Sequence, residues 1–221
     1  MSEAIRSRRS IRAFLPRAVD PRTVADILGV AAWAPSGSNM QPWQVHVVMD
    51  EPLRALRAAA LAAFEAGSIE PEWAYYPAPI PEPFLARRRA CGFGLYGHLG
   101  IERGDQAGRR HQHARNYELF DAPVALFFFM DARLARGSWL DYGMYLQNIM
   151  LLAREHGLDT CPQAAWLEQS RVVREQLAIP ASLTMVCGMA LGHRDESAHI
   201  NAFQPPREPV ATFTTWHGTR P

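Results

Sequence analysis

The segment 138–156, SWLDYGMYLQNIMLLAREH, has the composition of a helix but almost no polar face. Asp141 is its only charged residue before the last turn. A helix that is apolar on nearly all sides has to be covered on nearly all sides. The cover can come from its own domain, since 221 residues suffice to bury one such helix, or from a second subunit. The pattern therefore requires a core built around this helix and leaves both kinds of cover open.

Helices and strands alternate through much of the remaining chain. Asp20 and Pro21 suit the N-cap and first position of a helix that Pro35 ends, because the residue before a proline resists helical dihedral angles. Apolar runs predict strands at 43–49, 122–130 and 183–191. Further helices are predicted at 52–64 and 171–177.

Two parts of the chain differ from this pattern. Residues 68–118 contain the proline-rich aromatic stretch EPEWAYYPAPIPEP and two arginine-rich segments, which predict a loop and two helices that cover another part of the molecule. The tail 200–221 is proline-rich, and its apolar residues lack helical spacing, so we expect an extended arm. Because this arm has no evident place on its own domain, it and the apolar helix together favour an intertwined homodimer.

Composition excludes several classes of function. All 23 basic residues are Arg, which rules out a Schiff-base lysine, a pyridoxal-phosphate anchor and the lysine of Walker-type or kinase sites. A net charge of +1 provides no general attraction for nucleic acid or for anionic membranes. No apolar run approaches the roughly 20 residues that span a bilayer, and no secretory signal is evident, so we expect a soluble cytoplasmic protein.

Metal and disulfide chemistry are not indicated either. Three widely spaced cysteines do not suggest a disulfide framework, and no Cys/His cluster has the spacing of a zinc site. His111 and His113 stand two residues apart in a polar stretch, which fits a solvated face better than a metal site.

Two polar stretches carry candidate binding residues. RRSIR at 8–12 places three guanidinium groups and a hydroxyl within five residues, and guanidinium binds phosphate through paired N–H donors. A solvated basic segment is the alternative. APSGSNMQPW at 34–43 holds more hydrogen-bonding side chains between its two prolines than a plain turn needs. A further basic residue, Arg207, lies far away on the expected arm.

Five segments in order resemble the nitroreductase family of flavin mononucleotide (FMN) enzymes: RRSIRAF, APSGSNMQPWQV, LDYGMYLQN, GLDTCPQAAW and GHRDESAHINAFQPPREP. The resemblance covers nearly the whole chain. It implies an α+β fold, with a central mixed or antiparallel sheet flanked by helices, in an intertwined homodimer with an extended C-terminal arm. It also implies a single FMN-binding domain over 1–221, with residues 68–118 (the lid segment) as its variable lid.

The resemblance also implies roles for individual residues. The FMN phosphate and ribityl chain would be held by Arg8, Arg9, Ser10, Arg12 and Arg207. A loop of the partner subunit would lie over the flavin ring, with Pro35, Ser36, Gly37, Ser38, Asn39 and Gln41. A backbone N–H near flavin N5 would come from the segment Pro162, Gln163, Ala164 and Ala165, without a side-chain base.

Three positions qualify this assignment. Gln204 stands where many relatives have Arg or Lys, so phosphate binding would depend more on the arginines. Cys161 is expected to be a buried small residue rather than a nucleophile. Asp141 is interpreted as a carboxylate at the start of its helix rather than a catalytic group.

The implied activity is reduction of an aromatic nitro compound or a quinone by NADH or NADPH, in a ping-pong sequence through flavin N5. Trp73, Tyr75, Tyr76 and Phe84 could stack on an aromatic substrate, with packing under the lid as the alternative. Two other functions stay open: a flavin enzyme that oxidises its substrate or consumes flavin, and a non-catalytic flavin-binding protein. The physiological acceptor and the preference between NADH and NADPH cannot be read from the sequence.

Overall fold

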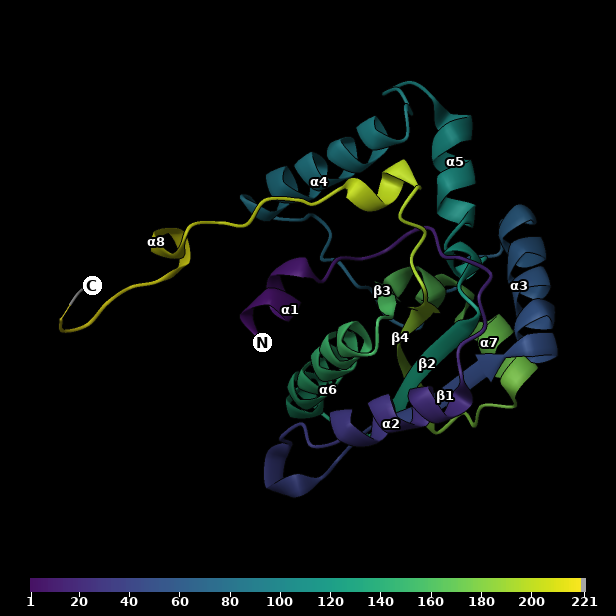
Figure 1. The fold of residues 1–221 in the computed structure, drawn as a ribbon, viewed down its shortest axis with the longest axis horizontal. Coiled ribbons are helices and arrows are strands. Elements are labelled where there is room, and N and C mark those ends of the chain that lie inside the picture. The colour runs from purple at the N-terminus through teal and green to yellow at the C-terminus, as the bar shows by residue number, and fades with distance from the viewer. Residues whose placement is uncertain (220–221) are drawn as a thin grey trace.

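The computed structural model describes residues 1–219 and has a four-stranded sheet at its centre (Figure 1). The strands are β1 (Gln44–Met49), β2 (Val124–Asp131), β3 (Asp159–Gln163) and β4 (Leu183–Gly192). They lie in the order β1-β2-β4-β3, and all three neighbouring pairs are antiparallel. Of the expected mixed or antiparallel sheets, the structure therefore has the antiparallel one.

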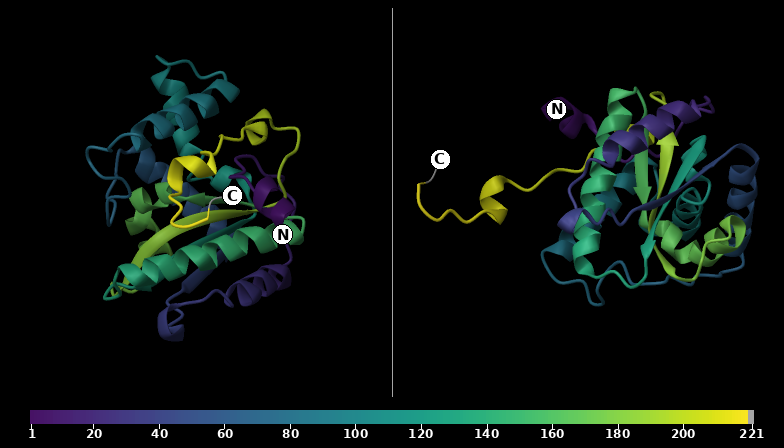
Figure 2. Two further views of the ribbon diagram at one scale, coloured as in Figure 1. Left: turned by 90° about the vertical axis from the view of Figure 1, so that its left-hand side faces the viewer. Right: turned by 90° about the horizontal axis from the view of Figure 1, so that it is seen from below.

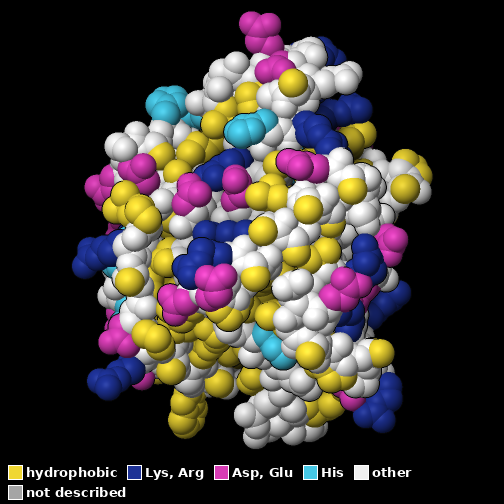
Figure 3. All heavy atoms as spheres, turned by 90° about the vertical axis from the view of Figure 1, so that its right-hand side faces the viewer, with side chains coloured by type: hydrophobic (Ala, Val, Ile, Leu, Met, Phe, Trp, Pro, Cys, Tyr) yellow, Lys and Arg dark blue, Asp and Glu magenta, His cyan; other side chains and the backbone are white. Residues whose placement is uncertain are grey.

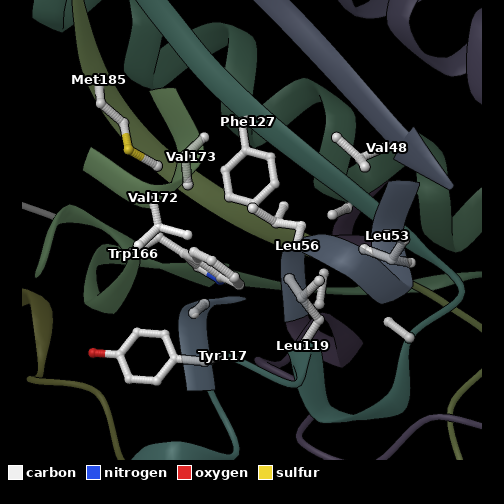
Figure 4. Packing of buried hydrophobic residues seen from close by; sticks show 14 of the residues in the cluster. Val48, Leu53, Leu56, Tyr117, Leu119, Phe127, Trp166, Val172, Val173 and Met185 are labelled. Atoms are coloured by element: carbon white, nitrogen blue, oxygen red, sulfur yellow. The ribbon is translucent and has the colours of Figure 1, made fainter. Parts of the chain in front are cut away.

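The two central strands are buried on both faces, so their sequences are apolar without alternation. On one face, Phe127 and Phe129 of β2 pack in a cluster with Leu56 and Trp166, part of which Figure 4 shows. Side chains on the other face, including Phe128, pack in a second cluster. The core thus lies in two layers, one on each side of the sheet.

Helices supply the outer part of each layer. The first cluster includes residues of α3 (Asp50–Glu65) and α7 (Ser170–Leu177), and the second includes residues of α2 (Pro21–Ala31) and α6 (Arg136–Glu155). Helix α6 is the apolar helix expected at 138–156. Its own chain does not cover it completely, because Leu140 is 70% exposed.

The elements differ from the sequence-based expectations at a few places. Three were missed: the short helices α1 (Ser2–Ser7) and α8 (Val210–Phe213) and strand β3. Helix α6 begins two residues earlier than expected, and α2 ends at Ala31, several residues before Pro35. Between Ala31 and Pro35 the chain tightens into turns, with Trp33 N donating to Val30 O and Ala34 N to Ala31 O.

Most of the lid segment and of the C-terminal tail lies outside the two layers (Figures 1 and 2), whereas Tyr117 near the end of the lid segment belongs to the first cluster. The lid segment consists of a loop followed by α4 (Phe84–His98) and α5 (Gln106–Ala114), as the sequence predicted. Residues 204–208 pass along α4, where Glu208 pairs with Arg87, and residues 209–219, with the one-turn helix α8 (Val210–Phe213), extend away from the body. The last two residues of the expected arm, 220 and 221, lie outside the described residues.

The surface over α3, α5 and α7 carries acidic and basic side chains in alternation, with no large patch of one sign (Figure 3). Several of these charges are paired, as between Arg115 and Asp121 and between Arg174 and Glu72. Across residues 1–219, none of the helices has the length and apolar character needed to cross a bilayer.

Candidate functional site

Residues from both ends of the chain line one small cavity beside α4. Its volume is about 120 Å³. Its lining residues are Arg8, Arg9, Ser10, Arg12, Cys91, Phe203, Gln204, Pro205 and Arg207. Burial lowers the pKa of Arg8, and the nearby positive charge of Arg207 lowers it further. The structure therefore brings together the basic residues that the sequence singled out at its two ends, and we call this space the arginine cavity.

A single buried amide side chain joins the two ends. Asn201 Oδ1 accepts a hydrogen bond from Arg12 N at 2.8 Å, across 189 positions of sequence. Its Nδ2 donates to Ala13 O and to Asp195 O, both at 2.8 Å. Asn201 thus fixes the backbone that carries Arg12 against the segment that leads to Arg207. The sequence analysis did not single it out, because one Asn within a quoted motif carries no signal of its own.

The segment after Arg9 runs beside β3. Ser10 forms a parallel bridge with Thr160, and Ile11 N donates to Thr160 O at 3.1 Å. Ile11 is completely buried, so its neighbours Ser10 and Arg12 point to the other side of the extended chain. This register places the basic residues next to the segment 160–163.

Free backbone donors follow directly on β3. The 3-10 helix η3 (Ala164–Gln169) has no side-chain hydrogen bond at its N-cap. The first N–H groups of a helix have no acceptor within the helix, so those of Ala164 and Ala165 stay available as donors. Both residues are half-buried. These N–H groups lie at the end of β3, the strand whose Thr160 is bridged to Ser10 of the arginine cavity. That one of them faces flavin N5 stays a prediction.

Gln163 and the end of α5 are linked by hydrogen bonds. Gln163 Nε2 donates to Asn116 O at 2.8 Å and lies 3.3 Å from Asn116 Oδ1. The adjacent Tyr117 OH donates to Glu168 Oε2 at 2.7 Å, and His113 Nε2 lies 3.0 Å from the same oxygen. Hydrogen bonding from His113, and then from Tyr117, lowers the pKa of Glu168 against the effect of its partial burial. Sequence reasoning missed Asn116, which no motif marks.

The backbone of loop 35–41 has left-handed dihedral angles at three residues. It contains the 3-10 turn η1 (Gly37–Asn39), and Ser38, Asn39 and Gln41 have positive φ values of 49°, 58° and 49°. Gly37 N donates to Asp141 Oδ2 at 3.1 Å. Asp141 is the sixth residue of α6 and is 8% exposed, so the expectation that it lies at the helix start is wrong. It anchors this loop instead.

Within one chain, the loop and the arginine cavity are apart. Pro35, Asn39 and Gln41 line a separate hollow beside α2, and none of the loop residues lines the arginine cavity. The loop lies on the opposite side of the molecule from α4 (Figures 1 and 2). The structure therefore does not unite Pro35, Ser36, Gly37, Ser38, Asn39 and Gln41 with the arginines of the same subunit.

The lid segment contacts the rest of the chain near its start and again in α4. At its start, Trp73 Nε1 donates to Met185 O at 2.9 Å, and the Trp73 ring packs edge-on against Trp139 at 4.8 Å. In α4, a Cβ on Gly94 would stand 2.7 Å from the Phe203 ring, so this helix approaches the C-terminal segment closely. Trp73 thus packs against the core, which is the alternative weighed for it.

The other three aromatic candidates are more open. Tyr75, Tyr76 and Phe84 are 55%, 50% and 57% exposed. Tyr75 and Tyr76 contact each other edge-on at 4.8 Å, while the Phe84 ring lies near the Arg87 guanidinium. Their stacking on a substrate stays a prediction.

A sequence model of the Nitroreductase family matches residues 5–193 of this chain. The chain belongs to the Nitroreductase family. It is 39% identical to a 4-nitrobenzoate reductase of Pseudomonas putida, over 97% of this chain and 94% of that protein. It is 40% identical to a chloronitrobenzene nitroreductase of Comamonas testosteroni, over 98% and 96%.

A solved structure of a Nitroreductase-family enzyme has the same fold throughout. It is the FMN and NADPH-dependent nitroreductase NfnB of Sphigopyxis sp. strain HMH, with 41% identity and a TM-score of 0.96 over 99% of both chains. The family match ends at residue 193, whereas Asn201 and Arg207 lie beyond it. The part of the arginine cavity that comes from the C-terminal segment is therefore not covered by the match.

Proposed function

We propose that this chain is an FMN-dependent oxidoreductase that uses NADH or NADPH to reduce aromatic nitro compounds or quinones. One observation carries the proposal: Arg8, Arg12 and Arg207 line one cavity, and Ser10 of the same cavity is bridged to Thr160 of β3, the strand that leads to the backbone N–H groups of Ala164 and Ala165. The relatives named for nitrobenzoate and chloronitrobenzene, and the FMN and NADPH-dependent structural neighbour, support the same activity.

The residues of this region fit FMN. Three buried polar atoms without a partner among residues 1–219 lie on the two segments that run side by side: Arg9 Nε, Thr160 Oγ1 and Gln163 Oε1. Guanidinium groups suit a phosphomonoester, and hydroxyl and amide groups suit the hydroxyls of a ribityl chain. Arg8, Arg12 and Arg207 would hold the phosphate, and the backbone at Ala164 and Ala165 would face the ring.

FMN, when bound, supplies the ring that accepts and donates hydride. The chain itself contributes position and charge. The donors at Ala164 and Ala165 are fixed because β3 is paired with β4 and because Trp166, the next residue, is fully buried. Fixed donors favour negative charge beside them without any rearrangement. Cys161 does not act as a nucleophile, since it is 2% exposed and burial raises the pKa of its thiol.

We further propose that two copies form a homodimer in which the loop 35–41 of one subunit reaches the arginine cavity of the other. Trp33, Met40 and Leu140 are 89%, 57% and 70% exposed, which leaves an apolar surface around α6 and this loop. Monomeric proteins rarely expose apolar surfaces of this kind. A second copy would cover the exposed side of α6. Its loop 35–41 would also reach the arginine cavity, which the same loop does not line within one chain. The lid segment would then close over the shared site.

A visible spectrum of the purified protein tests the proposed function. We expect bound FMN to give a yellow protein, whose colour NADPH removes in the absence of oxygen and 4-nitrobenzoate or a quinone then restores. A colourless protein that takes up no added FMN would contradict the proposal. Bound FMN that neither NADH nor NADPH reduces would identify a non-catalytic flavin-binding protein.

Deletion of residues 210–221 tests the dimer. This deletion keeps Arg207 but removes the exposed apolar side chains of Val210, Phe213 and Trp216. If these side chains cover a second subunit, the dissociation constant of the dimer should rise at least tenfold, as loss of about 1.4 kcal/mol of apolar contact would produce. Sedimentation at several concentrations measures it. Unchanged dimerisation would show that these residues do not hold the subunits together.

A further inference from the structure

The start of the lid segment is hydrogen-bonded to the 3-10 helix η3. Gln169 Nε2, at the last residue of η3, donates to Ser68 O at 2.8 Å, and Glu70 N donates to Glu168 O at 3.2 Å. Gln169 is 2% exposed, so water does not compete for its bond to Ser68. This end of the lid segment is therefore fixed to the second half of η3.

The end of the lid segment returns to the same short helix. Glu168 Oε2 accepts a hydrogen bond from Tyr117 OH at 2.7 Å and lies 3.0 Å from His113 Nε2. The Tyr117 ring is fully buried and packs edge-on against Trp166, within η3, at 5.6 Å (Figure 4). One carboxylate oxygen thus joins both side chains of the lid segment to η3.

The carboxylate of Glu168 keeps its charge in these surroundings. Hydrogen bonding from His113 lowers the pKa of Glu168, and hydrogen bonding from Tyr117 lowers it further, although partial burial acts in the opposite direction. Hydrogen bonds to a charged acceptor are shorter and stronger than those to a neutral one. The link between η3 and the end of the lid segment is therefore stronger than an ordinary hydrogen bond.

The path from Glu168 to the backbone donors of η3 is short. Glu168 follows Ala164 within the same helix, at a distance of about 8 Å for a rise of 2.0 Å per residue. Trp166 lies between them and is fully buried, with its ring edge-on to Phe127 at 4.9 Å, so η3 has no space to bend there. A displacement of Glu168 therefore moves the N–H groups of Ala164 and Ala165 as well.

We propose that Glu168 is a positioning residue, which holds η3 against the end of the lid segment and thereby sets where the N–H groups of Ala164 and Ala165 stand beside the flavin. The inference rests on the proposed function, which assigns these donors to the flavin ring. It makes the lid segment part of the structure that orients the donors, in addition to a cover. Neither the family resemblance nor the motifs gave Glu168 a role.

The variant Glu168→Met tests this role, because Met has a similar length and no carboxylate. Tyr117 OH can then donate to His113 Nε2, which lies 3.2 Å away, so the buried hydroxyl keeps a partner. A displaced donor stabilises the charge of the reduced ring less. We expect the equilibrium between reduced and oxidised bound FMN to shift about tenfold towards the oxidised form, which lowers the midpoint potential by about 30 mV. Redox titration against a dye of known potential measures it.

Stopped-flow reduction by NADPH provides the second arm. The limiting rate of flavin reduction should fall about tenfold in Glu168→Met. The NADPH concentration that gives half this rate should stay the same, because the lost contact lies within the protein. Tyr117→Phe removes one of the two donors, keeps the ring against Trp166, and should show both changes at smaller size. Glu175→Met is the matched control, since Glu175 is exposed on α7 and pairs with Arg171 of the same helix.

Hydrogen exchange of the cofactor-free protein is a readout that needs no flavin. Exchange in 163–169 and in 113–117 should rise together in Glu168→Met, because the variant removes the bond that joins these segments. An increase in neither segment contradicts the link between them.

The outcomes separate this inference from the proposed function. An unchanged midpoint potential together with an unchanged limiting rate, in a Glu168→Met protein that binds FMN, overturns this inference alone. A loss of FMN affinity without either change also overturns it, because Glu168 would then only stabilise the fold. A chain that takes up no FMN contradicts the proposed function, and the exchange result still decides whether Glu168 joins η3 to the lid segment.

Discussion

The double variant Arg8→Gln/Arg207→Gln is expected to bind FMN at least a hundredfold more weakly than the unsubstituted chain. Both side chains line the arginine cavity, and the positive charge of each favours binding of a phosphate dianion there. A hydrogen bond to a charged group contributes about 1.5–3 kcal/mol, which is about tenfold or more in affinity. When two such groups are removed, the two tenfold losses of FMN affinity should multiply. Fluorescence titration of FMN with the cofactor-free protein measures it.

The stability of the cofactor-free protein separates binding from folding in this experiment. Without a phosphate between them, Arg8 and Arg207 repel each other: the pKa of Arg8 is lowered first by its burial and then by the positive charge of Arg207. Removing either charge should leave the melting temperature of the cofactor-free protein unchanged or raise it. Arg22→Gln, on α2, serves as a control for loss of an exposed charge. If the double variant held FMN as tightly as before, the phosphate site would have to be elsewhere.

Gly188→Ala should lower the free energy of unfolding by about 2–3 kcal/mol, the upper part of the usual range for overpacking. Gly188 lies in the middle of β4, opposite Gln163. A Cβ there would stand 2.6 Å from Trp166 Cδ1 and 3.3 Å from the Phe127 ring. Both rings are fully buried in the cluster of Figure 4 and have no space to move into. Urea denaturation measures the change.

The same substitution should also affect the candidate site. A displaced Trp166 would shift the start of η3, which carries the donors at Ala164 and Ala165, so the rate of flavin reduction by NADPH should fall as well. Gly29→Ala is the matched control, because Gly29 lies in α2 with no atom within 4 Å of the added Cβ. This control should gain about 0.5–1 kcal/mol, since Ala favours a helix over Gly. Equal effects of the two substitutions would contradict the packing argument.

The elements with strong apolar patterns could be predicted from the sequence. β2 is apolar up to its last residue and β4 is apolar apart from Thr184, and α2 has the expected N-cap, with Asp20 Oδ1 accepting from Arg22 N at 2.8 Å. β3 was missed because DTCPQ contains a proline and only one β-branched residue, and its pairing with β4 alone makes it a strand. The start of α6 was misplaced because Ser138 suggested a cap, whereas the helix starts at Arg136 without a side-chain cap.

The candidate site was predictable in part. The arginines and the segment after β3 were found through the family resemblance, whereas their spacing alone allowed a solvated basic segment. Asn201 and Asn116 were missed because each acts through one amide side chain, and only the folded chain shows what that amide contacts.

The hydrogen bond from Arg12 N to Asn201 Oδ1 closes a loop of 189 positions, which has a consequence for the order of folding. Contacts this distant in sequence are costly in chain entropy and tend to form late. Such long-range contacts also open more readily than the strands of the central sheet, so amide hydrogen exchange should be faster where the two ends meet than in β2 and β4. A phosphate clamped between them would act as a non-covalent cross-link and slow that exchange throughout residues 8–14 and 195–207.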